Sequence, residues 1–116
     1  KGADIDQATD DGLTPLYIAC EKGHLEVVGL LVEKGADMNK AMNNARTPLF
    51  IACQEGHLEV VKLLVLMAAD INKARNDGKT PLEIAQNNRH YDIVNHLQTV
   101  GDQDQRRRGA QAGATE

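Results

Sequence analysis

The sequence predicts an all-α solenoid in which short helix pairs lie side by side along one core. The first observation is an internal repeat, because Thr-Pro-Leu occurs at 14–16, 47–49 and 80–82, with a period of 33 residues. A repeat of this length is typical of stacked supersecondary units. The second is composition, since hydrophobic residues make up 41% of the chain but aromatic residues only 3%. A core of Leu, Val, Ile and Ala suits closely packed helices better than a β-sandwich.

The repeat extends well beyond this tripeptide. Gly-His-Leu-Glu-Val-Val occurs at 23–28 and again at 56–61, and the third copy, at 89–94, is Arg-His-Tyr-Asp-Ile-Val. Gly-Ala-Asp occurs at 2–4 and 35–37. Chance does not keep so many positions in one register, so we expect three structurally equivalent units.

Each unit is predicted to contain two short helices. The proline starts the first helix, where its missing N–H has no cost, and the threonine before it can cap the helix. Gly23 and Gly56 stand where that helix would end in a left-handed conformation. Leu25, Val28 and Leu31 have the spacing of one face of the second helix. One such pair cannot bury its apolar face alone, so neighbouring units must supply the missing surface.

The third unit differs from the other two on its predicted outer face. Glu83, Gln86, His96 and Gln98 replace residues that are apolar or weakly polar in both earlier copies. A terminal repeat needs a polar outer face because no neighbour covers it, so we interpret residues 79–100 as a C-terminal cap. The first unit shows no such change, and we expect the chain to be a piece of a longer array.

The 33-residue period, the Thr-Pro-Leu helix start, the Gly-His between helices and the Gly-Ala-Asp turn resemble the ankyrin repeat. This resemblance implies an ankyrin-type helix-turn-helix solenoid with β-turn or hairpin-like connecting loops. The final segment has charged and small residues without an apolar period, which is typical of disorder. The expected divisions are the closing turn of a preceding repeat (1–6), two repeats (7–39 and 40–72), a capping repeat (73–101) and a disordered tail (102–116).

Two departures from the family pattern bear on stability and packing. Ala45, Ala68 and Arg89 stand where other copies have glycine, and in a left-handed conformation each side chain would cost about 1 kcal/mol. Tyr17 and Phe50 follow Thr-Pro-Leu at the position where the family usually has histidine. We expect these two rings to pack between repeats rather than contact a partner, because the cap has a glutamate there.

The histidine and cysteine positions favour structural roles over catalysis. His24, His57 and His90 fall at one position of successive repeats. Stacked helices lie about 10 Å apart, so these rings cannot share a metal ion with bonds near about 2 Å, and we expect inter-helix hydrogen bonds instead. Cys20 and Cys53 are separated in the same way, beyond the reach of a disulfide, and are predicted to be small buried hydrophobes. We expect no enzyme activity, no metal and no cofactor.

Charge and segment lengths narrow the class of partner. The formal net charge of −4 disfavours nucleic acid, which requires a basic face. No apolar run approaches the roughly 18 residues of a membrane-spanning helix. Three arginines at 106–108 leave open a minor nucleic-acid contact or a targeting role. Two cysteines do not make a disulfide framework, so we expect a location in the cytoplasm, with the nucleus as an alternative. We also expect a monomer.

The resemblance implies a protein-protein interaction module that binds a protein partner through its concave face. Two alternatives remain open: a regulatory ankyrin segment of a larger enzyme or channel, and an engineered or model repeat stack. Contact positions are expected to vary between copies while packing positions do not. The predicted contact residues lie at turn tips and first-helix edges: Asp10, Asp11, Leu13, Glu21, Lys22, Met42, Asn43, Asn44, Arg46, Gln54, Glu55, Arg75, Asn76, Asp77, Lys79, Asn87 and Asn88.

Overall fold

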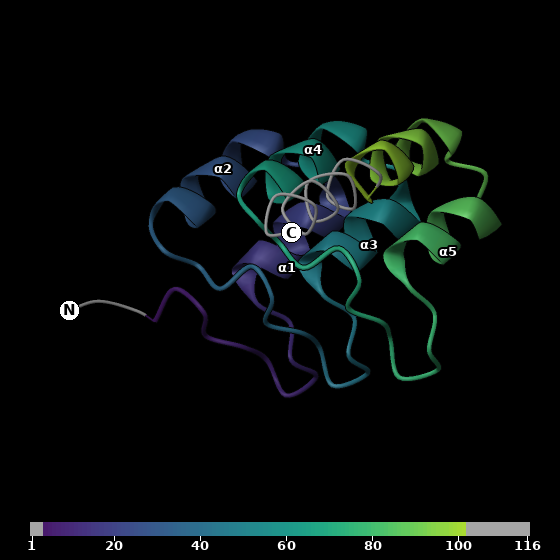
Figure 1. The fold of residues 1–116 in the computed structure, drawn as a ribbon. Helices are drawn as coiled ribbons and strands as arrows, with labels where there is room; N and C mark the ends of the chain where they lie inside the picture. Colours follow the sequence, from purple (N-terminus) through teal and green to yellow (C-terminus); the bar gives the residue numbers. More distant parts are fainter. Residues whose placement is uncertain (1–3, 102–116) are drawn as a thin grey trace, which may run out of the picture.

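Helix pairs in two layers make up the computed structural model, which describes residues 4–101 (Figure 1). One layer holds the first helix of each repeat and the other holds the second, while the connecting loops extend away from the first layer. The predicted all-α class is confirmed. The helices are α1 (Pro15–Lys22), α2 (Leu25–Glu33), α3 (Pro48–Glu55), α4 (Leu58–Leu66), α5 (Pro81–Asn87) and a further helix over 91–101.

The first helix of each repeat begins as the sequence predicts. Proline is at the first helical position, and the hydroxyl of Thr14 accepts a hydrogen bond of 3.1 Å from the backbone N–H of Tyr17. Thr47 caps α3 in the same way. Thr80 and Glu83 form a reciprocal capping box, because the Glu83 carboxylate also accepts from the Thr80 backbone N–H at 3.0 Å. The Thr-x-x-Glu spacing is the known signature of this cap, and it explains the glutamate in the third copy.

The positions at which Ala45, Ala68 and Arg89 replace the glycine of another copy have left-handed backbone angles. Gly23 and Gly56 end α1 and α3 with φ of 72° and 83°. Ala45, Ala68 and Arg89 have φ of 71°, 75° and 63°. The predicted strain at these three residues is therefore present in the fold.

The core lies between the two layers and continues from repeat to repeat. Helix α1 packs against α3, and α3 packs against α5, while α2 packs against α4. Tyr17 and Phe50 are buried, with exposed fractions of 2% and 0%, so both rings pack between repeats as predicted.

The outward side of the last repeat is polar in the structure. Glu83, Gln86 and Gln98 are exposed and His96 is half-buried.

Within residues 4–101, no helix has the length and apolar character needed to cross a bilayer. The tail predicted to be disordered, 102–116, lies outside the described residues.

Candidate protein-binding surface

Three hairpin tips project from the first layer of helices (Figure 1). In each tip the left-handed residue, Gly12, Ala45 or Gly78, donates its backbone N–H to the carbonyl three residues earlier. A second backbone hydrogen bond of 2.9–3.0 Å closes each hairpin, and the hairpin-like loops implied by the resemblance are thereby confirmed. The closing pairs are Thr9 with Leu13, Met42 with Arg46, and Arg75 with Lys79.

Hydrogen bonds also join each tip to the next. The backbone N–H of Asn43 donates to the carbonyl of Asp11 at 3.1 Å, and its side-chain amide donates to the carbonyl of Asp10 at 2.9 Å. Asn76 repeats the pattern on the second tip, with acceptors at Asn44 (3.0 Å) and Asn43 (3.4 Å). The tips therefore form one continuous row whose spacing is set by backbone contacts.

The edges of α1, α3 and α5 continue this row toward the second layer. Glu21 and Lys22 on α1 are exposed, as are Glu55 on α3 and Asn87 on α5. Because helix caps and neighbouring helices hold the backbone, these side chains stand at defined spacings.

The edge residues nearest the end of each first helix are partly used between repeats. The Asn88 amide donates to the backbone carbonyl of Gln54 at 3.0 Å. Gln54 is half-buried, and its amide donates to the Glu55 carboxylate at 3.2 Å. Asn88 and Gln54 thus help to join α3 to the third repeat, in addition to any contact with a partner.

Arg75 is held on the framework by two interactions. Its guanidinium donates to both carboxylate oxygens of Asp77, at 2.7 and 3.1 Å, and lies 5.2 Å from the centre of the Phe50 ring, within cation–π range. The hydrogen bond from Arg75, and a second from the Lys79 backbone N–H, lower the pKa of Asp77 to about 2. Arg75 therefore covers the buried Phe50 ring.

The structure divides the predicted contact residues into two groups. Leu13 and Met42 pack against the core, and Arg46 is half-buried with a buried Nε that has no partner in the described residues. Asn43 and Asn76 bond tip to tip. Both residues stand at the same position of successive copies. The repeated asparagine was the sequence feature that could have indicated a structural role rather than a contact with a partner. The exposed residues whose side chains make no described hydrogen bond to a neighbouring repeat are Asp10, Asp11, Glu21, Lys22, Glu55, Asp77 and Asn87.

Two of the repeated histidines have the predicted structural role. His57 Nε2 lies 2.9 Å from the carbonyl oxygen of Glu21, and His90 Nε2 lies 3.0 Å from that of Gln54. Each ring therefore joins the start of a second helix to the end of the preceding repeat's first helix.

The two thiols are inert in the folded chain. Cys20 and Cys53 are free and buried, and burial raises the pKa of each to about 12. A thiol with so high a pKa supplies almost no thiolate at neutral pH, and the thiolate is the nucleophilic form. Their predicted role as small buried hydrophobes is confirmed.

Comparison with known families agrees with this geometry. The family model described as ankyrin repeats (3 copies) matches residues 1–75 and 42–107. These matches cover most of the chain, and the protein belongs to the ankyrin repeat family. Ankyrin repeats are generally protein-interaction modules, and the family is typically non-catalytic. A comparison with curated proteins gives no match.

Proposed function

We propose that this chain binds a protein partner through the concave surface formed by the three tips and the exposed edges of α1, α3 and α5. The observation that supports this most directly is a row of exposed polar side chains on a backbone that is hydrogen-bonded from tip to tip. Such a surface loses little conformational entropy when it binds, because its backbone is already ordered.

The change of charge along the row of tips would set the orientation of a bound partner. The first tip has the exposed carboxylates of Asp10 and Asp11, whereas the second and third tips hold the half-buried cations Arg46 and Lys79. A partner that is basic at one end and acidic at the other would be steered into one register. The rest of the predicted set, including Asn44, Asn87 and Asn88, would supply hydrogen bonds around these charges.

Binding rather than catalysis also fits the described side chains. The two thiols are protonated at neutral pH because burial raises the pKa of Cys20 and Cys53 to about 12. A binding module of this kind needs no cofactor, and we propose that it acts as a monomer in the cytoplasm, without contact to nucleic acid or membrane.

Affinity capture with charge-reversal variants tests the proposed surface. Proteins retained at low salt by the immobilised chain are identified by mass spectrometry, and their affinities are then measured with purified components. Lys79→Glu is expected to lower the affinity for a true partner at least about tenfold, which corresponds to about 1.4 kcal/mol of binding free energy. Arg46→Glu should act in the same direction.

The matched control is Lys62→Glu, which reverses the same charge on α4 in the second layer. Lys62 is exposed, and its ion pair within residues 4–101 is with Glu59, at 3.7 Å; exposed pairs of this kind contribute little. A partner that binds all variants equally, or that loses as much affinity with Lys62→Glu, would contradict binding through the concave surface.

A further inference from the structure

Two of the three hairpin tips contain an aspartate followed by a glycine, Asp11–Gly12 in the first tip and Asp77–Gly78 in the third. The sequence has no other Asp–Gly pair and no Asn–Gly pair. Glycine has no Cβ, so its backbone nitrogen can approach the carboxyl group of the preceding side chain more closely than that of any other residue. Both pairs therefore have the composition needed for an intramolecular reaction of the backbone.

In this reaction the glycine nitrogen attacks Cγ of the aspartate, a step favoured because the two groups are held close together. The new N–Cγ bond closes a five-membered succinimide ring, and the carboxyl hydroxyl leaves as water with the proton of the amide nitrogen. Water then adds back to the ring. Cleavage of the N–Cγ bond restores aspartate, whereas cleavage between the nitrogen and the main-chain carbonyl carbon gives isoaspartate, whose backbone runs through Cβ. The mass is unchanged, and no other reactant is needed.

The two tips have the same local backbone. Gly12 and Gly78 are left-handed, with φ of 90° and 88°. The N–H of each donates to the carbonyl three residues earlier, at 2.9 and 2.8 Å. Each nitrogen must leave this hydrogen bond by local opening before it can react. Any difference between the two sites therefore comes from the groups around the turn.

The backbone of the first tip is covered by the second tip, whereas the third tip is the last of the row (Figure 1). A Cβ on Gly12 would lie 2.9 Å from the Cα of Met42, and the Asp11 carbonyl accepts a backbone hydrogen bond of 3.1 Å from the second tip. A Cβ on Gly78 would meet no atom within 4 Å. Among residues 4–101, no backbone N–H bonds to the Asp77 carbonyl. Neighbouring backbone thus restrains the first pair but not the second.

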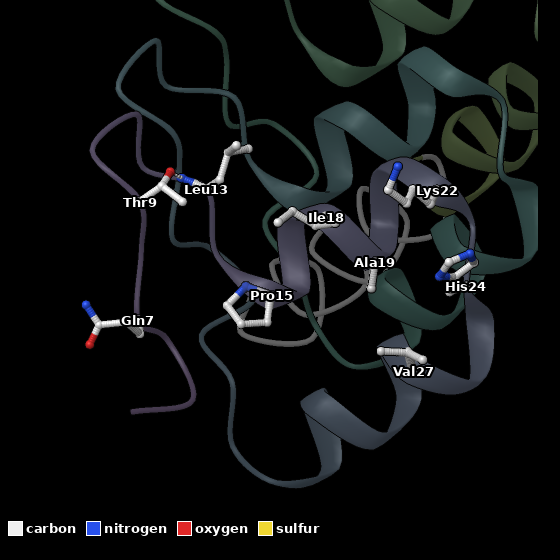
Figure 2. Close-up of a pocket in the computed structure, with 9 residues that line it drawn as sticks. All are labelled: Gln7, Thr9, Leu13, Pro15, Ile18, Ala19, Lys22, His24 and Val27. Atoms are coloured by element: carbon white, nitrogen blue, oxygen red, sulfur yellow. Dashed lines mark hydrogen bonds between the residues drawn. The ribbon is translucent and has the colours of Figure 1, made fainter. Parts of the chain in front are cut away.

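The two carboxyl groups differ in the opposite sense. In the third tip, Oδ1 of Asp77 accepts from the Lys79 backbone N–H at 3.1 Å, and the Arg75 guanidinium donates to both carboxylate oxygens, at 3.1 and 2.7 Å. In the first tip the corresponding N–H, that of Leu13, instead donates to the Thr9 hydroxyl at 3.1 Å, as Figure 2 shows. The third tip is therefore restrained through its carboxylate, and the first through its backbone.

The hydrogen bonds from Arg75 oppose succinimide formation in two ways. They direct both carboxylate oxygens toward the guanidinium, whereas attack requires Cγ to turn toward the nitrogen of Gly78. They also lower the pKa of Asp77 to about 2, and an ionised carboxyl cannot release its hydroxyl as water. The guanidinium is held in turn by the Phe50 ring, whose centre is 5.2 Å away. The restraint on the exposed carboxylate is thus anchored in the packed core.

We propose that Asp77–Gly78 is a latent site of isoaspartate formation and that the hydrogen bonds from Arg75 to the Asp77 carboxylate keep it unmodified. Loss of these bonds would leave the third tip with neither restraint. Isoaspartate there adds a methylene group to the backbone and shifts Lys79 relative to the second tip, so the modification would alter the row of tips. The proposal holds whether or not this row binds a partner.

Ageing of the intact chain near neutral pH tests the proposal. Isoaspartate is measured by enzymatic methylation with an isoaspartyl methyltransferase and S-adenosylmethionine, and it is located by peptide mapping with electron-transfer fragmentation. In Arg75→Gln it should form at position 77 at least about tenfold faster than in the wild type, because the protonated fraction rises about tenfold for each unit by which the pKa returns toward 3.8. The rate at Asp11–Gly12 in the same sample should not change.

Two further variants separate the carboxylate bonds from the general order of the tip. Asn76→Ala removes the side-chain bond of 3.4 Å to the second tip but keeps the Arg75–Asp77 pair, so the rate at position 77 should stay at the wild-type value. Gly78→Ala added to Arg75→Gln should slow the reaction again, because the new methyl group shields the nitrogen. The proposal is overturned if Arg75→Gln leaves the rate at position 77 unchanged, or if Asn76→Ala raises it as much.

The wild-type chain unfolded in urea supplies the limiting rate. The folded chain should form isoaspartate at position 77 at least about tenfold more slowly, because the bonds to Arg75 exist only in the fold; equal rates would refute the proposed protection. An equal increase at both Asp–Gly pairs in Arg75→Gln would indicate general unfolding. Arg75→Lys, which retains a positive charge, should then raise the rate at position 77 alone, and its failure to do so overturns the proposal.

Discussion

Gly35→Ala and Gly56→Ala form a matched pair that separates backbone strain from a steric clash. Both glycines are left-handed, with φ of 95° and 83°. A Cβ on Gly35 would meet no atom within 4 Å, whereas one on Gly56 would lie 2.6 Å from Cε1 of His90. The first substitution therefore tests the backbone conformation alone, and the second adds a clash with the histidine ring.

The expected costs follow from these distances. A left-handed alanine costs about 1–2 kcal/mol, so Gly35→Ala should lower the free energy of unfolding by about that amount. In Gly56→Ala the His90 ring must also move and lose its 3.0 Å bond to the Gln54 carbonyl, which adds about 0.5–1.5 kcal/mol. We expect a total of about 1.5–3.5 kcal/mol for Gly56→Ala.

Urea unfolding followed by circular dichroism measures both costs, and a double-mutant cycle isolates the clash. In a His90→Ala background, Gly56→Ala should cost no more than Gly35→Ala does, because the ring is absent. Equal costs for the two glycine variants in the wild-type chain would refute the steric argument. A Gly56→Ala penalty that is unchanged by His90→Ala would refute it as well.

Three further predictions follow from local geometry. Ala68→Gly should raise the urea midpoint, with a gain of about 1 kcal/mol, since φ is 75° there; no gain would show that the turn has adapted to alanine. The pKa of Asp77 should be about 2 by NMR titration and should rise toward 3.8 in Arg75→Gln. Because the folded carboxyl has the lower pKa, its contribution to stability is complete above about pH 4 and is lost as the pH falls toward 2. Cys20 and Cys53, whose pKa values are about 12, should react with a thiol reagent at pH 8 only as fast as the chain unfolds; rapid labelling of the native protein would contradict their burial.

Local features of the fold could be predicted because they depend on neighbouring residues in the chain. Thr14 and Thr47 cap helices through bonds to the third residue after them, and Gly23 ends α1 through its own φ. The burial of Tyr17 and Phe50 was also predictable, since their counterpart in the cap is a glutamate. This last inference came from comparing equivalent positions in the three copies.

The roles of the predicted contact residues depended on contacts between segments distant in the sequence. Asn43 bonds to a tip 33 residues earlier, and Arg75 lies over Phe50 while it binds Asp77. Their positions in the sequence suggested exposed side chains that could contact a partner. In the fold, both side chains instead bind neighbouring residues of the repeat framework. The capping box of Thr80 agrees with the Thr-x-x-Glu spacing in the sequence, although Glu83 was interpreted there only as part of a polar outer face.

The repeat, the helix boundaries and the left-handed positions could be derived from the sequence, because helix starts, caps and turns depend on residues close together in the chain. Contacts between repeats were needed to show which of two identical side chains is buried. Val27 and Val60 stand in the same Leu-Glu-Val-Val segment, yet their exposed fractions are 45% and 1%. The difference arises because burial depends on a neighbouring repeat, and α2 covers α4 while no described segment covers α2 on its other side.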